Sequence, residues 1–383
     1  MRKEYLPFAL QDTGTEEIEA VTACLNSGWI TTGKECKKFE EKFSEFFGDD
    51  VHSIAINSAT MGMQIALEGL GIKRGDEIIT TPYTFSATAM VGVHLGATPV
   101  FVDICPRTLN IDVDKIEAAL TPKTKAILPV HIAGHPCDMD KILSLASKHN
   151  LKVVEDAAHA FPTTYKNKLI GTLGSDATVF SFYATKTMTT GEGGMIVTKN
   201  KELVEYAKLM RLHGISRDVF DRYIRKGSKW YYEITAPGYK CNLTDLAASI
   251  GLCQLEKARG FQKRRQEIAE KYLKAFQDLP AHLPYHDENM HSWHLFILRL
   301  KEGSPINRDQ FIEMMETKYN IGCSVHFIPL HIQPYWRDLL QLKKEDFPEA
   351  YKNYLQAVSL PIYTKMTDQD VEDVIFAVRD LLK

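Results

Sequence analysis

Short runs of β-branched and other apolar residues recur between residues 51 and 199, and stretches with helical spacing separate them. Strands and helices in such alternation are typical of an α/β fold whose sheet is mostly parallel. Helices are indicated over 60–71 and 138–150, where apolar residues return every three or four positions. The expected strands are HSIAIN (52–57), DEIITT (76–81), TPVFVD (98–103), TKAILPV (124–130), LKVVED (151–156), DATVFSF (176–182) and GGMIVTK (193–199).

The segments on either side of this block carry their own patterns. Before it, Phe39, Phe43 and Phe46 stand at helical spacing, which predicts a helix whose aromatic side chains belong to the core. After it, a long helical stretch over 244–276 leads into a second, smaller α+β unit. The elements expected there are strands at 293–300 and 323–328 and helices at 308–319 and 368–382.

The absence of a flexible linker bears on the domain organisation. No Gly/Ser-rich tract or internal repeat separates the two units, so we expect the boundary to lie on a rigid helix. The expected division is a large domain of residues 14–250 and a small C-terminal domain of residues 251–383. Residues 1–13 are expected near the cleft between them.

Composition and charge exclude several classes of protein. With 44% hydrophobic and 25% charged residues and a formal net charge of -3, the chain is neither disordered nor basic enough to suggest nucleic acid as a partner. Its apolar runs are shorter than the roughly 20 residues that span a membrane, and the N-terminus lacks the apolar core of a signal peptide. Seven cysteines without a Cys-x-x-Cys pair fit free thiols, and we expect a cytoplasmic protein.

Polar residues follow three of the expected strands, at the edge where a parallel sheet binds ligands. After strand 52–57, Ser58, Ala59 and Thr60 stand at a helix start, where free backbone N–H groups favour an anion such as a phosphate. The simpler interpretation is an N-cap and nothing more. The segment alone does not decide between them.

The other two strand ends carry a carboxylate and an amine. Asp156 ends a strand apolar enough to be buried on both faces, and a buried carboxylate needs a cation or a proton, unless it merely caps the following turn. Lys186 lies between a buried strand and a Gly-rich turn, where desolvation can lower the pKa of its amine and suit it to imine formation. Taken singly, Lys186 reads more simply as a surface lysine.

One compact ligand needs an anion seat, a carboxylate and an amine around it at once. That ligand is pyridoxal 5'-phosphate (PLP), which has a phosphate, a ring nitrogen and an aldehyde. In this interpretation Asp156 keeps the ring nitrogen protonated, and Lys186 first holds the aldehyde and then moves protons. The three strand ends together therefore favour a PLP enzyme over their separate structural interpretations.

Four motifs resemble one known family. SFYATKTMTTGEGG, EDAAHA, NSATMGM and PGYKCNLTD are similar to the DegT-type sugar aminotransferases, which have the type I PLP-transferase fold. The resemblance runs nearly end to end, and SFYATK followed by GEGG is its most specific part. It implies a Schiff base on Lys186, pairing of Asp156 with the ring nitrogen, and a phosphate held by the Ala59 and Thr60 amides with the Ser181 hydroxyl.

The resemblance also assigns the surroundings of the cofactor. Phe85 would stack on the pyridine ring, with a core aromatic at a helix start as the alternative. His159 would lie near the phenolic oxygen of the ring, unless it is a structural histidine. Asn242 matches an asparagine that reaches the phosphate from the neighbouring subunit, which implies a homodimer with shared active sites. The residues that would line the sugar-nucleotide cleft are Tyr5, Trp29, Ile30, Thr31, Lys240 and His326.

Some of these residues have simpler explanations, and one further segment suggests a site superficially. Trp29 can equally be core packing, and Lys240 a solvated charge. The segment 131–138 contains two histidines, a cysteine and an aspartate, but their spacing fits no standard zinc motif, so no metal is expected.

The implied reaction transfers an amino group from glutamate to the keto group of a sugar carried by a nucleotide. The stretch 236–242 most resembles aminotransferases that make UDP-4-amino-4-deoxy-L-arabinose for lipid A, which favours a UDP-linked 4-keto sugar. The loop YATKTMTTGEGG is closer to the general family form. A 4-keto pentose and a 4-keto-6-deoxy-N-acetylhexosamine therefore both remain open, for lipopolysaccharide or another surface polysaccharide.

Several rival functions remain. A dTDP- or GDP-linked keto-hexose, or a cyclitol, is an alternative substrate. Sugar dehydratases on the same fold replace the lysine with histidine, so Lys186 argues against that activity. A non-catalytic PLP-binding regulator would have no reason to keep Lys186, Asp156 and the phosphate seat together.

Overall fold

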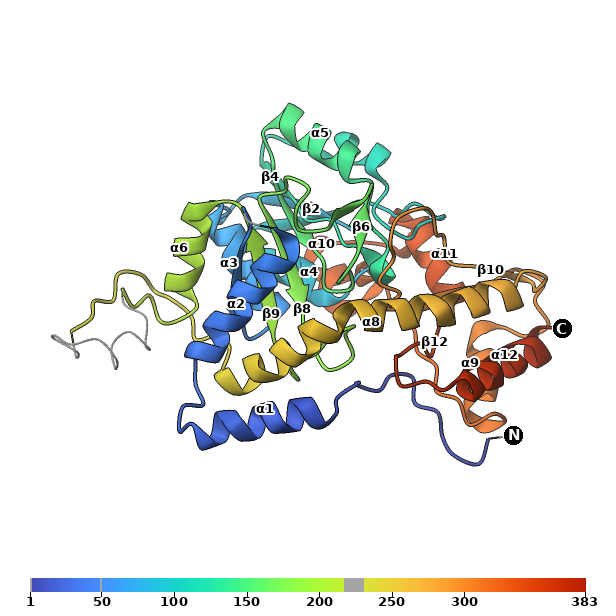
Figure 1. Ribbon diagram of the computed structural model, residues 1–383. Helices are drawn as coiled ribbons and strands as arrows, with labels where there is room; N and C mark the ends of the chain where they lie inside the picture. Colours follow the sequence, from blue (N-terminus) through green and yellow to red (C-terminus); the bar gives the residue numbers. More distant parts are fainter. Residues whose placement is uncertain (1, 49, 217–230) are drawn as a thin grey trace.

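The computed structural model describes residues 2–48, 50–216 and 231–383, and its centre is a seven-stranded sheet (Figure 1). Each of the seven expected strands takes part in this sheet, which confirms the α/β class. The strands are β1 (His52–Ile56), β2 (Glu77–Thr80), β3 (Thr98–Phe101), β4 (Thr124–Ile127), β5 (Lys152–Asp156), β8 (Ala177–Ser181) and β9 (Gly194–Thr198).

The sheet is mixed, because one strand runs against the others. Its order is β1-β9-β8-β5-β4-β2-β3. Strand β9 is antiparallel to both of its neighbours, β1 and β8, whereas the remaining pairs are parallel. The carboxyl ends of β1, β2, β5 and β8 therefore share one edge with the amino end of β9, where Gly194 lies opposite Ile56 and Ser181.

Helices cover one face of the sheet with an aromatic core. Phe39 and Phe43 are fully buried and Phe46 partly buried, as their spacing predicted, and they pack against apolar side chains of the strands. The elements on this face are α2 (Lys34–Phe47), α5 (Met139–His149) and the first part of α8 (Asp245–Ala275).

The opposite face is covered by a second set of helices. Side chains alternate across each strand, so Ile54 and Ile56 face this side whereas Ala55 faces the other. The helices here are α3 (Ala59–Gly69), α4 (Ser86–His94) and α6 (Lys201–Met210). Helix, sheet and helix thus form three layers (Figure 1).

A smaller antiparallel sheet, in the order β10-β11-β12, lies toward the C-terminal part of the chain. Apolar residues of this sheet, of the second part of α8 and of the last helix form one cluster, which Leu6 joins from the N-terminal segment. Its elements are β10 (Ala281–His282), β11 (Phe296–Leu300), β12 (Ala357–Leu360), α9 (Arg308–Thr317) and α12 (Asp368–Leu382).

Further elements complete the described chain. Helix α1 packs on α8, and the β6–β7 hairpin follows β5. Their bounds, with those of the two remaining α-helices, are α1 (Thr15–Asn26), β6 (Thr164–Tyr165), β7 (Lys168–Leu169), α10 (Pro334–Leu340) and α11 (Pro348–Gln356). In the part of the chain that the structure describes, no helix is both long and apolar enough to cross a lipid bilayer.

Helix α8 connects the two cores. Its residues up to Ala258 belong to the cluster of the large sheet, and those from Ile268 onward to the cluster of the small sheet. We keep the division into residues 14–250 and 251–383 as a proposal; on α8 the change of core falls somewhat later, between Ala258 and Ile268.

One expected strand did not form. In 323–328 only Ser324 pairs, through an isolated bridge to Ser359, because the chain then turns so that His326 and Phe327 line a cavity instead of extending the small sheet.

Candidate active site

A cavity of about 490 Å³ lies at the edge of the large sheet where the carboxyl ends of its strands meet. The ends of β5 and β8, the start of α3 and the β2–α4 connection surround it, and segments near 294 and 326 complete the wall from the small-sheet side. The structure brings together here eight of the residues expected from the sequence: Ala59, Thr60, Phe85, Asp156, His159, Ser181, Lys186 and His326.

Asp156 is the buried acid of the cavity, with 5% of its surface exposed. Its Oδ2 accepts a 2.7 Å hydrogen bond from the hydroxyl of Thr88, and its Oδ1 accepts one of 3.1 Å from the amide of Ala158. Burial raises the pKa of Asp156, and these hydrogen bonds together with the charge of Lys186 act in the opposite direction. The carboxyl group is thus poised to pair with a cation or to share a proton.

Lys186 lies in the turn between β8 and β9 and supplies the amine. The residue keeps some exposure, yet desolvation of the amine lowers the pKa of Lys186 to about 8, while the carboxylate of Asp156 acts to raise it. An amine with this pKa is partly neutral near pH 8 and can act as a nucleophile or as a base. Lys186 is therefore not an ordinary surface lysine.

His159 has a fixed tautomer. The amide of Ala133 donates to Nδ1 of His159 at 3.3 Å, so in the neutral ring the proton is on Nε2. Burial holds the pKa of His159 well below its usual range, and the positive charge of Lys186 adds to that effect. The ring of His294 lies 4.4 Å from it, centroid to centroid. A neutral His159 can thus offer an N–H donor at Nε2.

The start of α3 forms the anion seat. Ser58 caps this helix, since its hydroxyl accepts a hydrogen bond from the amide of Met61, and the first amides of a helix have no partner within it. A Cβ atom at Gly194 would lie 2.7 Å from the amide nitrogen of Ala59. Glycine at this position therefore allows β9 to approach the helix start without filling the space around its free N–H groups.

Two aromatic side chains flank the opening. Phe85 is 64% exposed and its ring lies 6.1 Å from that of Phe327, and both line the cavity. The alternative of a core aromatic is therefore wrong for Phe85. Phe327 also stacks on His159 at 5.8 Å, and His326 stacks on Phe8 of the N-terminal segment at 5.4 Å. This last contact brings the N-terminal segment beside the cavity.

Five of the expected residues lie elsewhere, in one group beside β1. Lys240 donates to Oδ1 of Asn242, which donates from Nδ2 to the hydroxyl of Thr32 at 2.5 Å. The loop that contains Thr32 also contains the remaining members of the group. These residues do not line the cavity of their own chain: Trp29, Ile30, Thr31, Lys240 and Asn242.

Tyr5 belongs to neither group. It is half exposed and lies against Gly322, where a Cβ atom would come within 2.4 Å of its hydroxyl oxygen.

The polar side chains of 131–138 have protein partners. Nε2 of His131 contacts the buried carboxylate of Glu155 at 2.8 Å, and the thiol of Cys137 donates to the carbonyl of Val130 at 3.1 Å. Asp138 caps α5 by accepting from the amide of Lys141. These contacts give the segment a structural role next to β5, the strand that contains Glu155.

The sequence pattern of one family matches residues 11–379. The chain belongs to the DegT/DnrJ/EryC1/StrS aminotransferase family. This result confirms the resemblance of the motifs and the enzyme class expected from them. Both the cavity and the residues gathered around it thus belong to an aminotransferase.

Individual proteins match the chain over nearly its whole length. The spore coat polysaccharide biosynthesis protein SpsC of Bacillus subtilis is 50% identical over 385 residues, covering 100% of this chain and 98% of SpsC. Spr1654 of Streptococcus pneumoniae in its PMP form is 34% identical, with a TM-score of 0.92 and 98% of each chain covered. Its PLP form is 32% identical, with a TM-score of 0.90 and coverage of 99% and 100%.

A third relative is PseC of Helicobacter pylori, an aminotransferase involved in the biosynthesis of pseudoaminic acid. It is 30% identical, with a TM-score of 0.90 and 99% of each chain covered. These likenesses confirm the PLP-transferase architecture expected for the DegT family.

Sequence reasoning missed several residues that line the cavity, among them Thr84, Thr88, His294 and Phe327. The threonines carried a signal, because they stand four residues apart on either side of Phe85, where the chain passes from a strand end into a helix. A hydroxyl chain results, in which Thr84 bonds Thr88 at 2.8 Å and Thr88 bonds Asp156. His294 and Phe327 come from the other core, and no local pattern indicates where they fold.

Proposed function

We propose that this chain is a PLP-dependent aminotransferase that moves an amino group from glutamate to the C4 keto group of a UDP-linked sugar. The observation that carries the proposal is the meeting of the Lys186 amine, the Asp156 carboxyl group and the start of α3 around one cavity. The cofactor rests on the same observation, and the PLP and PMP forms of Spr1654 support it.

The residues of the cavity fit PLP group by group. Asp156, a buried acid that accepts hydrogen bonds from the Thr88 hydroxyl and the Ala158 amide, would pair with the ring nitrogen. The amides of Ala59 and Thr60 and the hydroxyl of Ser181 would hold the phosphate, and Phe85 would cover the ring. When bound, PLP supplies a ring that withdraws electrons from the carbon that exchanges its amino group.

Lys186 and His159 would have separate tasks, proton transfer and orientation of the cofactor. Lys186 would hold the cofactor. Once released, its Nζ would take a proton from the α-carbon of the amino donor and deliver it to the C4' carbon of the cofactor. Its lowered pKa, about 8, keeps a neutral fraction of Nζ for this task. His159 would donate its Nε2–H toward the cofactor's phenolic oxygen.

The nature of the sugar rests on the relatives. SpsC is named for spore coat polysaccharide biosynthesis and PseC for pseudoaminic acid biosynthesis, which supports a nucleotide-linked sugar on the way to a surface polysaccharide. A 4-keto pentose and a 4-keto-6-deoxy-N-acetylhexosamine, both linked to UDP, are the two candidate substrates. The two sugars differ in their ring substituents, so the shape of the cavity determines which of them the enzyme accepts.

We further propose a homodimer with shared active sites. The group of Trp29, Ile30, Thr31, Lys240 and Asn242 does not line the cavity of its own chain. Asn242 would reach the phosphate of the partner's cofactor, and the other members would contact the sugar nucleotide together with Tyr5 and His326. The seven free cysteines fit a reducing compartment, so we place the enzyme in the cytoplasm.

Two assays test this function in sequence. The PLP-loaded protein, mixed with glutamate alone, should change its absorption spectrum and release 2-oxoglutarate in an amount equal to the enzyme. Each UDP-linked 4-keto sugar is then added to that protein, and mass spectrometry follows the amino sugar. Formation of either amino sugar supports the proposal.

Other outcomes separate the rivals. A spectral change with glutamate but turnover only with a dTDP- or GDP-linked keto-hexose or a cyclitol would overturn the UDP assignment. No spectral change with any amino donor would instead favour a PLP-binding regulator.

A further inference from the structure

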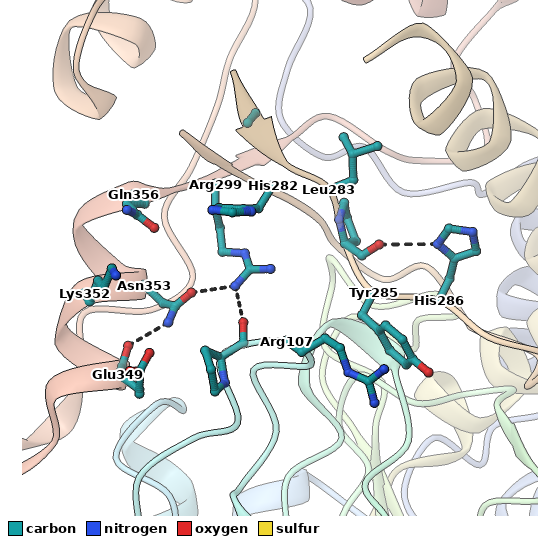
Figure 2. A pocket seen from close by; sticks show the side chains of 13 residues that line it. Arg107, His282, Leu283, Tyr285, His286, Arg299, Glu349, Lys352, Asn353 and Gln356 are labelled. Atoms are coloured by element: carbon teal, nitrogen blue, oxygen red, sulfur yellow. Dashed lines mark hydrogen bonds between the residues drawn. The ribbon is translucent and has the colours of Figure 1, made fainter. Parts of the chain in front are cut away.

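A second cavity, of about 590 Å³, lies between the small sheet and the large-sheet side of the chain. Its wall is built from the end of β10 and the residues after it, from β11, from α11 and from the loop that contains Arg107 (Figure 2). It shares no lining residue with the active-site cavity. Its volume is within the range of small-molecule sites, roughly 300–1,000 Å³.

The charges around this cavity are unbalanced. Arg107, Arg299 and Lys352 line it, whereas its acidic lining consists of Glu349. Within residues 2–48, 50–216 and 231–383, none of these three cations forms an ion pair. Arg107 instead lies over the ring of Tyr285, 4.2 Å from its centroid. Unpaired cations from separate segments therefore converge on one concave surface.

Arg299 is the buried member of this set, with 6% of its surface exposed. Its Nη1 donates to Oδ1 of Asn353 at 2.6 Å and to the carbonyl of Pro106, and its Nε has no hydrogen-bond partner among the described residues. A buried charge with an unsatisfied donor is unfavourable unless an anion or water completes it. Figure 2 shows Arg299 between the α11 side chains and the pair of Arg107 and Tyr285.

The pKa of the neighbouring His282 is affected by the same positive charges. His282 faces Arg299 across the antiparallel pairing of β10 and β11. Burial lowers the pKa of His282, and the charges of Arg299, Lys301 and Lys352 add to the effect. An anion bound in the cavity would oppose these charges and raise that pKa.

We propose that this cavity is a second ligand site of the protein, which binds a small phosphate-bearing molecule between Arg299, Arg107 and Lys352. Arginine and lysine are the usual partners of phosphate, and Arg299 is held in place by Asn353 and Pro106 before any ligand arrives. The ring of Tyr285 and the side chains of Leu283 and Pro284 offer apolar surface for the organic part of such a ligand.

Nuclear magnetic resonance of the histidine rings tests the site directly. The full chain is saturated with PLP, so that phosphate probes cannot enter the cofactor seat, and the His282 signal is assigned by its loss in His282→Gln. Pyrophosphate and UDP should shift the His282 signal saturably and raise its pKa, whereas neutral uridine should not. Tighter binding of UDP than of pyrophosphate assigns a contact to the nucleoside, and equal binding assigns recognition to the phosphates.

Two matched variants decide whether charge in this cavity is responsible. Lys352→Gln should weaken pyrophosphate binding by about tenfold, the effect of losing one charged hydrogen bond. Glu349→Gln should strengthen binding, because it removes the opposing carboxylate. Lys141→Gln, at a lysine paired with Asp114 elsewhere on the surface, should leave binding unchanged. The proposal is overturned if His282 shows no saturable shift, or if Lys352→Gln and Glu349→Gln bind pyrophosphate alike.

Discussion

The hydroxyl of Thr88 donates a 2.7 Å hydrogen bond to Oδ2 of Asp156, and this bond links helix α4 to the acid at the centre of the cavity. The bond acts to lower the pKa of Asp156 against the effect of burial. Thr88 therefore favours the ionised carboxylate that would pair with the ring nitrogen of PLP, and it would act through Asp156.

Replacing Thr88 tests this link. Thr88→Val keeps the shape and removes the hydroxyl, so the pKa of Asp156 should rise and the affinity for PLP should fall by about tenfold, as expected for a lost hydrogen bond to a charged group. Equilibrium titration with PLP measures this affinity. Thr88→Ser keeps the donor and should bind almost as tightly as the native protein; equal weakening in both variants would show that packing, not the hydrogen bond, matters.

The amine of Lys186 should titrate far below other lysines in cofactor-free protein. Its pKa of about 8 lies below the usual 10.5, because the amine is desolvated. Acetylation of Lys186, followed by peptide mass spectrometry across a pH series, should be half-maximal near pH 8. In Asp156→Asn the midpoint should move lower, since the carboxylate acts to raise this pKa. A midpoint near 10 would contradict the burial of the amine.

The same shift makes the stability of cofactor-free protein depend on pH. Between about pH 8 and pH 10.5 the unfolded chain binds the Lys186 proton and the folded chain does not, so the contribution of this group to stability rises with pH. Urea unfolding of the native protein and of Lys186→Met at pH 8 and pH 10 measures the contribution. Relative to Lys186→Met, the native protein should gain stability between these two pH values, and a relative loss would contradict the sign.

Gly194 and Gly260 form a matched pair of glycines. A Cβ atom at Gly194 would lie 2.7 Å from the Ala59 nitrogen, whereas one at Gly260 in α8 meets nothing within 4 Å. Gly194→Ala should therefore destabilise the protein by about 1–3 kcal/mol and weaken PLP binding at the displaced helix start. Gly260→Ala should stabilise it by up to about 1 kcal/mol. Thermal unfolding and PLP titration of both variants check this contrast.

Mixing two inactive variants tests the shared active site. If Asn242 serves the cavity of the partner, a mixed dimer of Lys186→Ala and Asn242→Ala contains one site with both defects and one intact site. Random exchange of subunits at equal amounts should then restore about a quarter of the native sites. An Asn242 that acted within its own chain would leave every site with one defect, and mixing would restore nothing.

The sequence was sufficient for the residues that follow strands. Lys186, Asp156 and Ser181 stand at or just beyond strand ends that alternation and β-branched runs identify, and the carboxyl ends of such strands meet at one edge. Local spacing also identified the aromatic core of α2. These features depend on short-range patterns, which a single sequence contains in full.

The remaining features depend on long-range packing. His294 and Phe327 reach the cavity from the second core. The alternating residues of 323–328 predicted a strand, but a local pattern does not show that the chain turns after Ser324. The resemblance implies that Asn242 contacts the cofactor and Lys240 the substrate. Within one chain, Lys240 donates to Asn242, and Asn242 donates to the hydroxyl of Thr32. The unpaired cations around Arg299 come from three distant segments and had no signal in the sequence.

Chemical trapping identifies the amine that holds the cofactor. PLP-loaded protein is reduced with borohydride, digested and analysed by peptide mass spectrometry. The cofactor should be found covalently attached to the peptide that contains Lys186, and Lys186→Ala should retain none. Attachment to a different lysine, or no attachment to the native protein, would show that Lys186 does not form the Schiff base.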